Sequence, residues 1–377
     1  RQMCIRDRQK IDICGSENIN LKNKKCLTIG DLKARIPVIQ GGMGVGISLS
    51  SLAGNVALHG GIGVISSAQI GFRDPGWESQ PVETNLRVLK EEIRKAKEIA
   101  RGGIIAVNIM AATRFYEKYV KAAVEAGADM IISGAGLPVE LPSFVKDSRV
   151  RIAPIVSSLK SFEVINRYWK KKYDKSPDLV VIEGPLAGGH LGFKREELQD
   201  IEGLHYEEEV RRIIQRVHDA GEEEAIPVVV AGGIYEGADA LPYMEMGADG
   251  VQVATRFVTT YECDADLRYK EAYLKAEKED IVIVKSPVGM PGRAIRNTFL
   301  KQAENGSIPK GKCHQCLEKC DPAKIPYCIT DALVNAAKGN TEQGLLFCGA
   351  NAYKAKRLEH VSDIMKEFEE VLSWQQE

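Results

Sequence analysis

The sequence lacks an excess of charge of either sign. Its 377 residues carry 51 lysines and arginines against 52 aspartates and glutamates, which leaves a formal net charge of −1. A chain without a basic surplus has little attraction for nucleic acid or for an anionic membrane surface. We therefore expect neither as a partner and expect a small-molecule substrate instead. A homodimer stays open as an alternative to a monomer.

Long apolar runs are also missing. The longest stretches, such as LVVIEG and PVVVAGG, are far shorter than the roughly 20 residues that a membrane-spanning helix needs. The first residues mix charged and apolar side chains, do not begin with Met and do not resemble a signal peptide. We expect a cytoplasmic protein, and we set the first eight or so residues aside because they look unlike the rest of the chain.

Cysteine is too sparse for a disulfide scaffold, with nine residues in the whole chain. Four of them, however, crowd into CHQCLEKCDPAKIPYC with the spacing C-x2-C-x3-C-x7-C. Grouped thiolates suit a tetrahedral Zn²⁺ or a [4Fe-4S] cluster, and buried free thiols are the alternative. The spacing predicts a metal site at Cys313, Cys316, Cys320 and Cys328, with His314 as an alternative zinc ligand.

What the sequence has in abundance is a regular alternation of short β-branched runs and longer helical patterns. This alternation is typical of βα units around a parallel sheet. The predicted strands are 36–40, 62–67, 103–109, 129–134, 151–157, 178–184, 226–233 and 249–257. The predicted helices are 84–101, 114–126, 159–173, 206–220, 236–246 and, last in the chain, 355–372.

Eight strands, each apolar on both faces, favour a closed barrel over a doubly wound sheet. The glycines in EAGAD (125–129) and EMGADG (245–250) are typical of a helix end that leads directly into a strand. We predict an α/β fold: a (β/α)8 TIM barrel over 30–280, preceded by an N-terminal extension (1–29). Residues 281–377 are expected to form a lid or appendage that holds the cysteine cluster and a closing C-terminal helix.

The residues that follow the predicted strands form the catalytic face of such a barrel. They are rich in glycine and small polar groups and poor in the clustered Asp, Glu and His of a hydrolytic metal site. Glycines after the seventh and eighth strands suit a phosphate group, and Gln40 and Asn108 offer amides to a pyrimidine edge, so flavin mononucleotide (FMN) fits. The candidate cofactor contacts are Gln40, Gly41, Gly42, Met43, Asn108, Ser133, Gly134, Lys160, Glu183, Gly188, Gly189, Gly232, Gly233, Ala254 and Thr255.

Several motifs together resemble one known family. PVIQGGMGVGIS, VNIM, SGAG, EGPLAGGHLG, VVAGGI and GADGVQVATRF occur in the order and spacing of the nitronate monooxygenases, formerly called 2-nitropropane dioxygenases. The same motifs resemble the related flavin-dependent enoyl-acyl-carrier-protein reductases. The resemblance covers roughly residues 30–300, and GLLFCGANAY (344–353) is similar to the family's C-terminal segment near the flavin.

The resemblance implies a TIM barrel with non-covalently bound FMN and a catalytic histidine at His190. It implies an amide contact from Asn108, ring contacts at Ser133 and Gly134, and phosphate contacts at Gly188, Gly189, Gly232, Gly233, Ala254 and Thr255. Many family members have Gly where Ala254 stands, which leaves that contact to a backbone N–H with less room. A histidine whose pKa lies near neutrality can take a proton from a carbon acid or hold an anionic substrate.

The expected function is an FMN-dependent oxidoreductase, a monooxygenase that oxidises alkyl nitronates with O₂. The alternatives are an enoyl thioester reductase or a flavin reductase that uses NAD(P)H, and a flavin- or metal-binding sensor without turnover. The cysteine cluster departs from the family pattern, and an iron–sulfur cluster there would favour one-electron transfer. Substrate choice is expected to depend on the segments 70–82 and 281–348.

Overall fold

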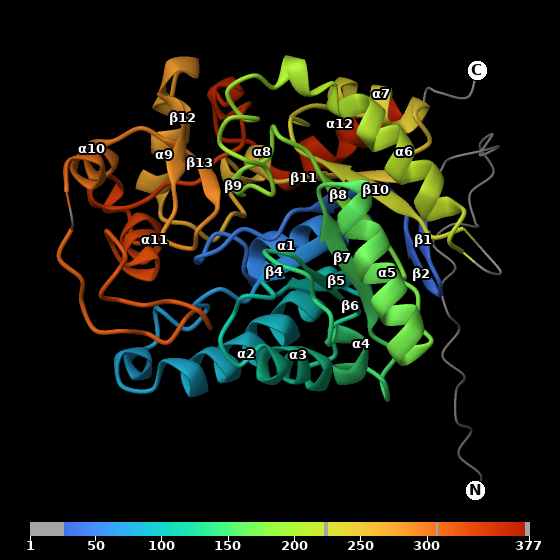
Figure 1. The fold of residues 1–377 in the computed structure, drawn as a ribbon, viewed down its shortest axis with the longest axis horizontal. Coiled ribbons are helices and arrows are strands. Elements are labelled where there is room, and N and C mark those ends of the chain that lie inside the picture. Colours follow the sequence, from blue (N-terminus) through green and yellow to red (C-terminus); the bar gives the residue numbers. More distant parts are fainter. Residues whose placement is uncertain (1–25, 222–224, 307, 374–377) are drawn as a thin grey trace, which may run out of the picture.

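The computed structural model describes residues 26–221, 225–306 and 308–373. Eight parallel strands close into a barrel in the order β10-β11-β3-β4-β5-β6-β7-β8 (Figure 1). They are β3 (Val38–Gln40), β4 (Ile62–Ser66), β5 (Ile104–Asn108), β6 (Met130–Ser133), β7 (Arg151–Val156), β8 (Val180–Glu183), β10 (Val228–Ala231) and β11 (Gly250–Val253). Each lies within the run predicted for it, so the predicted TIM barrel is confirmed.

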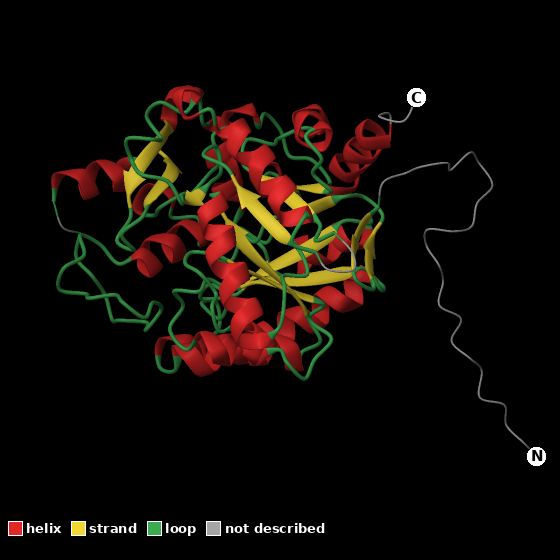
Figure 2. Ribbon diagram, turned by 45° about the vertical axis from the view of Figure 1, so that its right-hand side comes forward, coloured by secondary structure: helices red, strands yellow, loops and turns green. Residues whose placement is uncertain are grey.

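Helices surround the barrel on the outside (Figure 2). They are α1 (Ser50–Leu58), α2 (Pro81–Ala100), α3 (Tyr116–Glu125), α4 (Leu141–Phe144), α5 (Leu159–Tyr173), α6 (Tyr206–His218), α7 (Gly237–Glu245) and α12 (Val361–Ser373). The six predicted helices are confirmed to within a few residues at each end. The sequence analysis missed α1 and α4, because α1 is apolar nearly all round and α4 has only four residues.

Aspartates at the N-terminal end of the barrel tie neighbouring strands together. A side-chain oxygen of Asp129 accepts a hydrogen bond from the backbone N–H of Ile105 (2.7 Å). Asp178 accepts from Ile152 (2.8 Å) and Asp249 from Val228 (2.9 Å) in the same way. Two of these aspartates belong to the Gly-Ala-Asp turns, whose glycines have the left-handed φ values of +85° and +103° expected after a helix.

An N-terminal hairpin covers the same end of the barrel. Strands β1 (Leu27–Ile29) and β2 (Leu32–Ala34) pair antiparallel, and their apolar side chains join the cluster that fills the barrel interior. That interior cluster includes Ile39, Val64, Ile132 and Val181 from the strands. The interior is therefore a packed core, and a ligand site must lie beyond the other end of the strands.

An insertion separates the last barrel strand from the last barrel helix. After β11 come α8 (Thr255–Val258) and α9 (Leu267–Lys275), then the hairpin β12 (Ile281–Lys285) and β13 (Pro291–Ile295), then α10 (Thr298–Asn305) and α11 (Ile329–Ala337). Short 3-10 helices are found at Pro75–Glu78, Glu202–Leu204, Lys278–Asp280, Thr341–Gln343 and Ala352–Lys354. The chain then returns to the barrel, where α12 packs between α7 and α1 and completes the outer ring.

The insertion has its own small apolar core. Val284, Phe299, Tyr327, Ile329 and Leu345 are buried together there, apart from the barrel clusters. The hairpin also pairs with the barrel, because β13 is hydrogen-bonded to the two-residue strand β9 (Gly189–His190). Among the described residues, none of the helices combines the length and apolar character that crossing a bilayer requires.

Candidate active site

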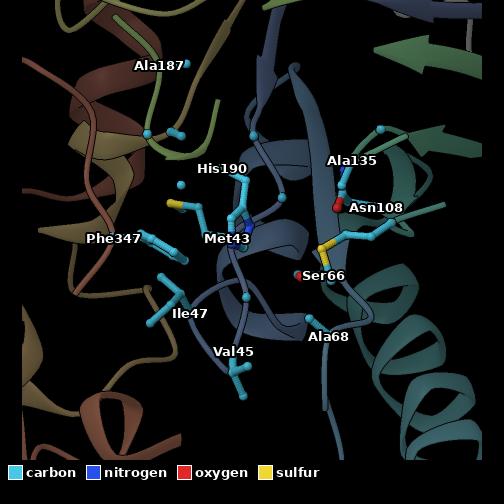
Figure 3. Close-up of a pocket in the computed structure, with 18 of the residues that line it drawn as sticks. Met43, Val45, Ile47, Ser66, Ala68, Asn108, Ala135, Ala187, His190 and Phe347 are labelled. Carbon is cyan, nitrogen blue, oxygen red and sulfur yellow. The ribbon is translucent and has the colours of Figure 1, made fainter. Parts of the chain in front are cut away.

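A cavity lies at the C-terminal ends of the barrel strands, where the barrel meets the insertion (Figure 3). Loops after β3, β4, β5, β6, β8, β10 and β11 contribute to its wall. The sequence-predicted residues that line it are Gly41, Gly42, Met43, Asn108, Gly134, Glu183, Gly188, Gly189, His190, Gly232, Gly233, Ala254 and Thr255. Residues from near both ends of the chain thus meet at one cavity, from Gly41 and Gly42 to segment 347–349.

Three predicted contacts lie outside the cavity wall. Gln40 is fully buried, and its amide is used within the protein: it donates to Ser48 Oγ (3.0 Å) and accepts from the Val64 N–H (3.0 Å). Ser133 donates to the Ile109 carbonyl (2.7 Å) and accepts from Tyr116 (2.8 Å).

Lys160 is exposed in the first turn of α5. Gln40 and Ser133 therefore shape the wall from behind, because their polar atoms are already paired. Lys160 is simply on the outside of the protein.

Glycines let three segments come together at one end of the cavity. A Cβ atom on Gly188 would lie 2.6 Å from the backbone of Cys348, and one on Gly349 would lie 2.6 Å from Thr255 Oγ1. Gly232 and Gly233 have φ values of +101° and +82°, which L side chains rarely adopt. Gly188 and Gly232 lie against main chain, and Gly233 and Gly349 lie against the side chains of Leu186 and Thr255, so these glycines allow the segments to pack closely.

Gly189 differs from its neighbours. Its φ is +72°, yet a Cβ built on it would meet nothing within 4 Å. The residue lines the cavity, so its open side is the cavity itself. The backbone there is free to approach a bound ligand closely.

His190 lies on β9, beside its partner strand β13. Its Nε2 lies 2.7 Å from the hydroxyl oxygen of Ser286, and its ring meets Phe347 edge-on at a centroid distance of 4.9 Å. Ser286 is 2% exposed and also accepts the N–H of Val288 (3.4 Å). The geometry is compatible with either direction of this hydrogen bond; we assign the Ser286 hydroxyl as the donor to Nε2, an assignment that puts the ring proton on Nδ1.

Burial lowers the pKa of His190 to about 4. This corrects the expectation of a pKa near neutrality: desolvation disfavours the imidazolium, and no carboxylate lies close enough to oppose that effect. At neutral pH the side chain is an uncharged imidazole. It offers Nδ1–H as a donor and is a weak base.

The polar side chains of Asn108, Glu183 and Gln252 line the cavity and make no hydrogen bond to the described part of the protein. Burial raises the pKa of Glu183 to about 7. All three residues are half-buried at the cavity wall, so their polar atoms are available to bind a ligand.

The cavity contains little charge. Within the described residues, its wall includes no lysine or arginine, and Glu183 carries its only carboxylate. Arg256 follows Thr255 in sequence, but it turns away to Glu359 (3.0 Å) and Glu367 (2.6 Å). Anionic groups in the ligand must therefore rely on backbone N–H groups and hydroxyls.

The predicted metal site is not supported. Cys313, Cys316, Cys320 and Cys328 are free thiols, and the described residues include no group of three or more His, Cys, Asp or Glu that could hold a metal ion. Different contacts fix this segment: the Cys316 carbonyl accepts the Arg114 N–H (3.1 Å), and Cys328 begins α11.

His314 is engaged as well. Its Nε2 lies 3.1 Å from Asp331, and its ring stacks on Trp77 at 4.1 Å. His314 is thus committed to other partners, and the described residues give no support to a metal ion at the four cysteines.

Several lining residues were missed by the sequence analysis. They are Gln252 from β11, Tyr269 and Tyr273 from α9, and Val288, Leu317, Ile329 and Leu333 from the insertion. Ser286, the partner of His190, was missed too. The segment GLLFCGANAY, expected near the flavin, does contribute Phe347, Cys348 and Gly349 to the wall. Gln252 lies within the motif GADGVQVATRF but was not singled out there, and the other missed residues belong to segments that carry no motif.

Comparison with known proteins places the fold and the motifs in context. The family model described as nitronate monooxygenase matches residues 26–370. A probable nitronate monooxygenase from Staphylococcus saprophyticus is 24% identical over an alignment 373 residues long, and the match covers 91% of this chain and 98% of that protein.

Two solved structures have the same fold. FabK from Thermotoga maritima has a TM-score of 0.65 at 23% identity, covering 90% of this chain and 94% of that one. A nitroalkane oxidase from Streptomyces ansochromogenes has a TM-score of 0.67 at 18% identity, covering 90% and 96%. At these identities the likeness establishes the fold alone.

Proposed function

The chain belongs to the nitronate monooxygenase family, and from that premise we propose that it is an FMN-dependent oxidoreductase that oxidises alkyl nitronates with O₂. One observation carries the proposal: His190 lines the same cavity as the glycines of three converging segments. A cofactor bound by main chain and a reactive side chain above it are the two elements that such an enzyme needs.

The residues present fit FMN. Gly188, Gly189, Gly232, Gly233, Ala254 and Thr255 line one end of the cavity and are the residues that would hold the phosphate. The unpaired amides of Asn108 and Gln252 would bind the polar edge of the ring system, and Glu183 would accept hydrogen bonds from ribityl hydroxyls. When bound, FMN supplies the redox chemistry: it takes electrons from the substrate and passes them to O₂.

His190 would orient the substrate and would not deprotonate it. With its pKa lowered to about 4, the side chain is neutral at physiological pH. Its Nε2 is held by Ser286, which leaves the Nδ1–H to donate a hydrogen bond to a nitronate oxygen. A nitronate is already an anion and needs no base, so a neutral donor suits it better than it suits a nitroalkane.

A second candidate is reduction of an enoyl thioester with NAD(P)H. The same Nδ1–H would polarise a thioester carbonyl, and an uncharged donor in a cavity without lysine or arginine also matches a neutral substrate. NAD(P)H would then replace O₂ as the redox partner. Both candidates use the same bound cofactor.

An anaerobic titration separates them. Purified protein is mixed separately with an alkyl nitronate, NADH and NADPH while the flavin spectrum is recorded. We expect rapid bleaching with the nitronate and reoxidation by O₂. Rapid bleaching only with NADH or NADPH supports the reductase, and no bleaching with any of the three contradicts both enzymes and favours a sensor.

We also predict a cytoplasmic location, which fractionation of cells that express the protein would test. The oligomeric state is either a monomer or a homodimer, and light scattering on the purified protein would decide between them.

A further inference from the structure

The cavity has a second region that a small nitronate would not fill. Beyond His190 its wall includes Val45, Ile47, Val288, Leu317, Ile329 and Leu333, which we call the apolar chamber, together with the uncharged polar side chains of Thr113 and Thr330 beside them. Figure 3 shows Val45, Ile47 and Phe347 on the side of the cavity away from Ala187.

The chamber is formed by two parts of the protein that the sequence holds far apart. Val45 and Ile47 belong to the loop between β3 and α1, and the other four residues belong to the insertion. A third segment, the loop between β5 and α3, is joined to the insertion where Thr113 pairs with Leu317 and the Arg114 N–H donates to the Cys316 carbonyl. Main-chain hydrogen bonds therefore tie this part of the insertion to the barrel.

Helix α11 forms the far end of the chamber. Ile329 and Leu333 are four residues apart and so lie on one face of the helix, which faces the cavity. Leu333 packs against two apolar clusters: Val45, Phe72 and Trp77 on one side and the insertion core on the other. The chamber cannot extend past Leu333, because packed side chains lie behind it.

No charged group is available to bind a polar tail in the chamber. Within the described residues, the ionisable carboxylate and imidazole of the cavity are those of Glu183 and His190, and neither belongs to the chamber wall. A ligand that placed a carboxylate there would lose its hydration without gaining a cationic partner. Moving the apolar surface of a ligand from water into the chamber, in contrast, is favourable.

We propose that the apolar chamber holds the alkyl chain of the substrate and that Leu333 limits the length of that chain. This inference rests on the proposed function, because it assumes that the reacting group lies beside His190. It assigns to this protein substrates with an unbranched, uncharged chain of several carbons, as opposed to short nitronates or nitronates that end in a carboxylate.

A chain-length series tests the proposal. The FMN-loaded enzyme is assayed with straight-chain primary nitronates from two to ten carbons and with propionate 3-nitronate. We expect kcat/KM to rise about two- to fourfold for each added methylene and then to fall sharply at one length. A flat series, or higher kcat/KM with propionate 3-nitronate than with the uncharged nitronate of equal length, overturns the proposal.

Variants at position 333 sharpen the test. Leu333→Ala should move the preferred length up by two or more carbons, and Leu333→Trp should move it down. Leu300 is the matched control, because it is 4% exposed in the insertion core and does not line the cavity. Leu300→Ala should lower stability without moving the preferred length. An identical length profile in all four proteins contradicts the role of Leu333.

A binding experiment distinguishes failure of the proposed function from failure of the chamber proposal. If no nitronate is oxidised, straight-chain carboxamides of two to ten carbons are titrated into the FMN-loaded protein and the flavin spectrum is followed. Affinity that rises with length and depends on residue 333 supports the chamber although the nitronate reaction has failed. Affinity independent of length overturns the chamber as well.

Discussion

The barrel and the insertion form two halves of one cavity by different means. The barrel contributes main chain: the glycines after β8 and β10 and the Ala254–Thr255 turn after β11. The insertion contributes side chains, among them Val288, Leu333 and Phe347. Main-chain contacts do not depend on which side chains a segment carries, whereas side-chain contacts change with each substitution. We therefore expect the glycine-lined barrel loops to bind the cofactor, and the insertion, together with Val45 and Ile47 of the barrel, to determine substrate choice.

The strongest test of this division is Gly189→Val, on the barrel side. A side chain there would project into the cavity and would force valine into a φ of +72°. We expect the purified variant to be colourless and its affinity for FMN to fall by at least about 100-fold, since a ligand-facing backbone is blocked. The measurement is flavin content after purification, followed by titration with FMN.

Gly127→Val is the matched control for that variant. Gly127 also has a left-handed φ (+85°), and a Cβ at this position would likewise meet open space, but it lies in the turn before β6 at the other end of the barrel. The control should lose a similar amount of stability and keep its FMN. Equal loss of FMN in both variants would mean that the cause is backbone strain and not a side chain that blocks the ligand site.

The next largest effect is expected at His190, where barrel and insertion join. His190→Ala removes the Nδ1–H donor and should lower turnover about 10²- to 10³-fold while FMN stays bound. Because burial lowers the pKa of His190 to about 4, the ratio of wild-type turnover to variant turnover should be the same at every pH between 6 and 8. Steady-state kinetics across that range provide the check.

His218→Ala is the control for this variant, because His218 bonds Asp249 near the opposite end of the barrel (3.0 Å). Its turnover should be unchanged. Glu183, whose pKa burial raises to about 7, is present in the wild type and in His190→Ala and cancels in the ratio of their turnover. A ratio that follows a single group titrating near about 6.5 would refute the neutral donor and restore a base at His190.

Sequence alone was sufficient for the barrel because every βα unit repeats one pattern. Short β-branched runs with glycine turns, such as EMGADG before β11, predict a strand and its register without knowledge of the rest. The motif around His190 could likewise be placed after a strand. Gln40 shows the limit: its position at a strand end was right, but its amide is used by Ser48 and Val64.

The insertion could not be predicted in this way. Its strands β12 and β13 form a sheet with residues 189–190, which lie far earlier in the chain, and no local pattern encodes such a contact. Ser286 lies in a segment crowded with proline and glycine that indicated only a loop. The four cysteines show a related limit: their spacing suggested a metal site, but the described residues include no group of three or more side chains that could hold a metal ion.

Glu183 offers a test of the barrel half before any ligand is bound. Burial raises its pKa from 4.5 to about 7, so the folded state holds more protons than the unfolded state between those values. Stability should therefore fall as pH rises through that window. Above it, the ionised buried carboxylate should cost the FMN-free protein about 2–3 kcal/mol.

Glu183→Gln should remove this cost. The FMN-free variant should unfold at a higher temperature than the wild type at pH 8 and at a similar temperature at pH 4.5, measured by calorimetry. The lowered pKa of His190 acts with the opposite sign, but it is common to both proteins and cancels in their difference. Glu207→Gln, on the exposed start of α6, is the control and should change neither value. A difference of equal size at both pH values would contradict burial as its cause.

The smallest effect is expected at Ser286, on the insertion side. Ser286→Ala takes away the hydrogen bond to Nε2 of His190 and leaves the ring free to carry its proton on either nitrogen. One such hydrogen bond contributes about 1–1.5 kcal/mol, so kcat should fall about tenfold, with FMN affinity and KM nearly unchanged. Ser286→Thr keeps a hydroxyl and should recover most of the activity, whereas Ser143→Ala, a surface control, should have none of these effects. If Ser286→Ala instead releases FMN, the insertion also holds the cofactor, and the division between barrel and insertion fails. If kcat does not change, packing against Phe347 is enough to hold His190 in place.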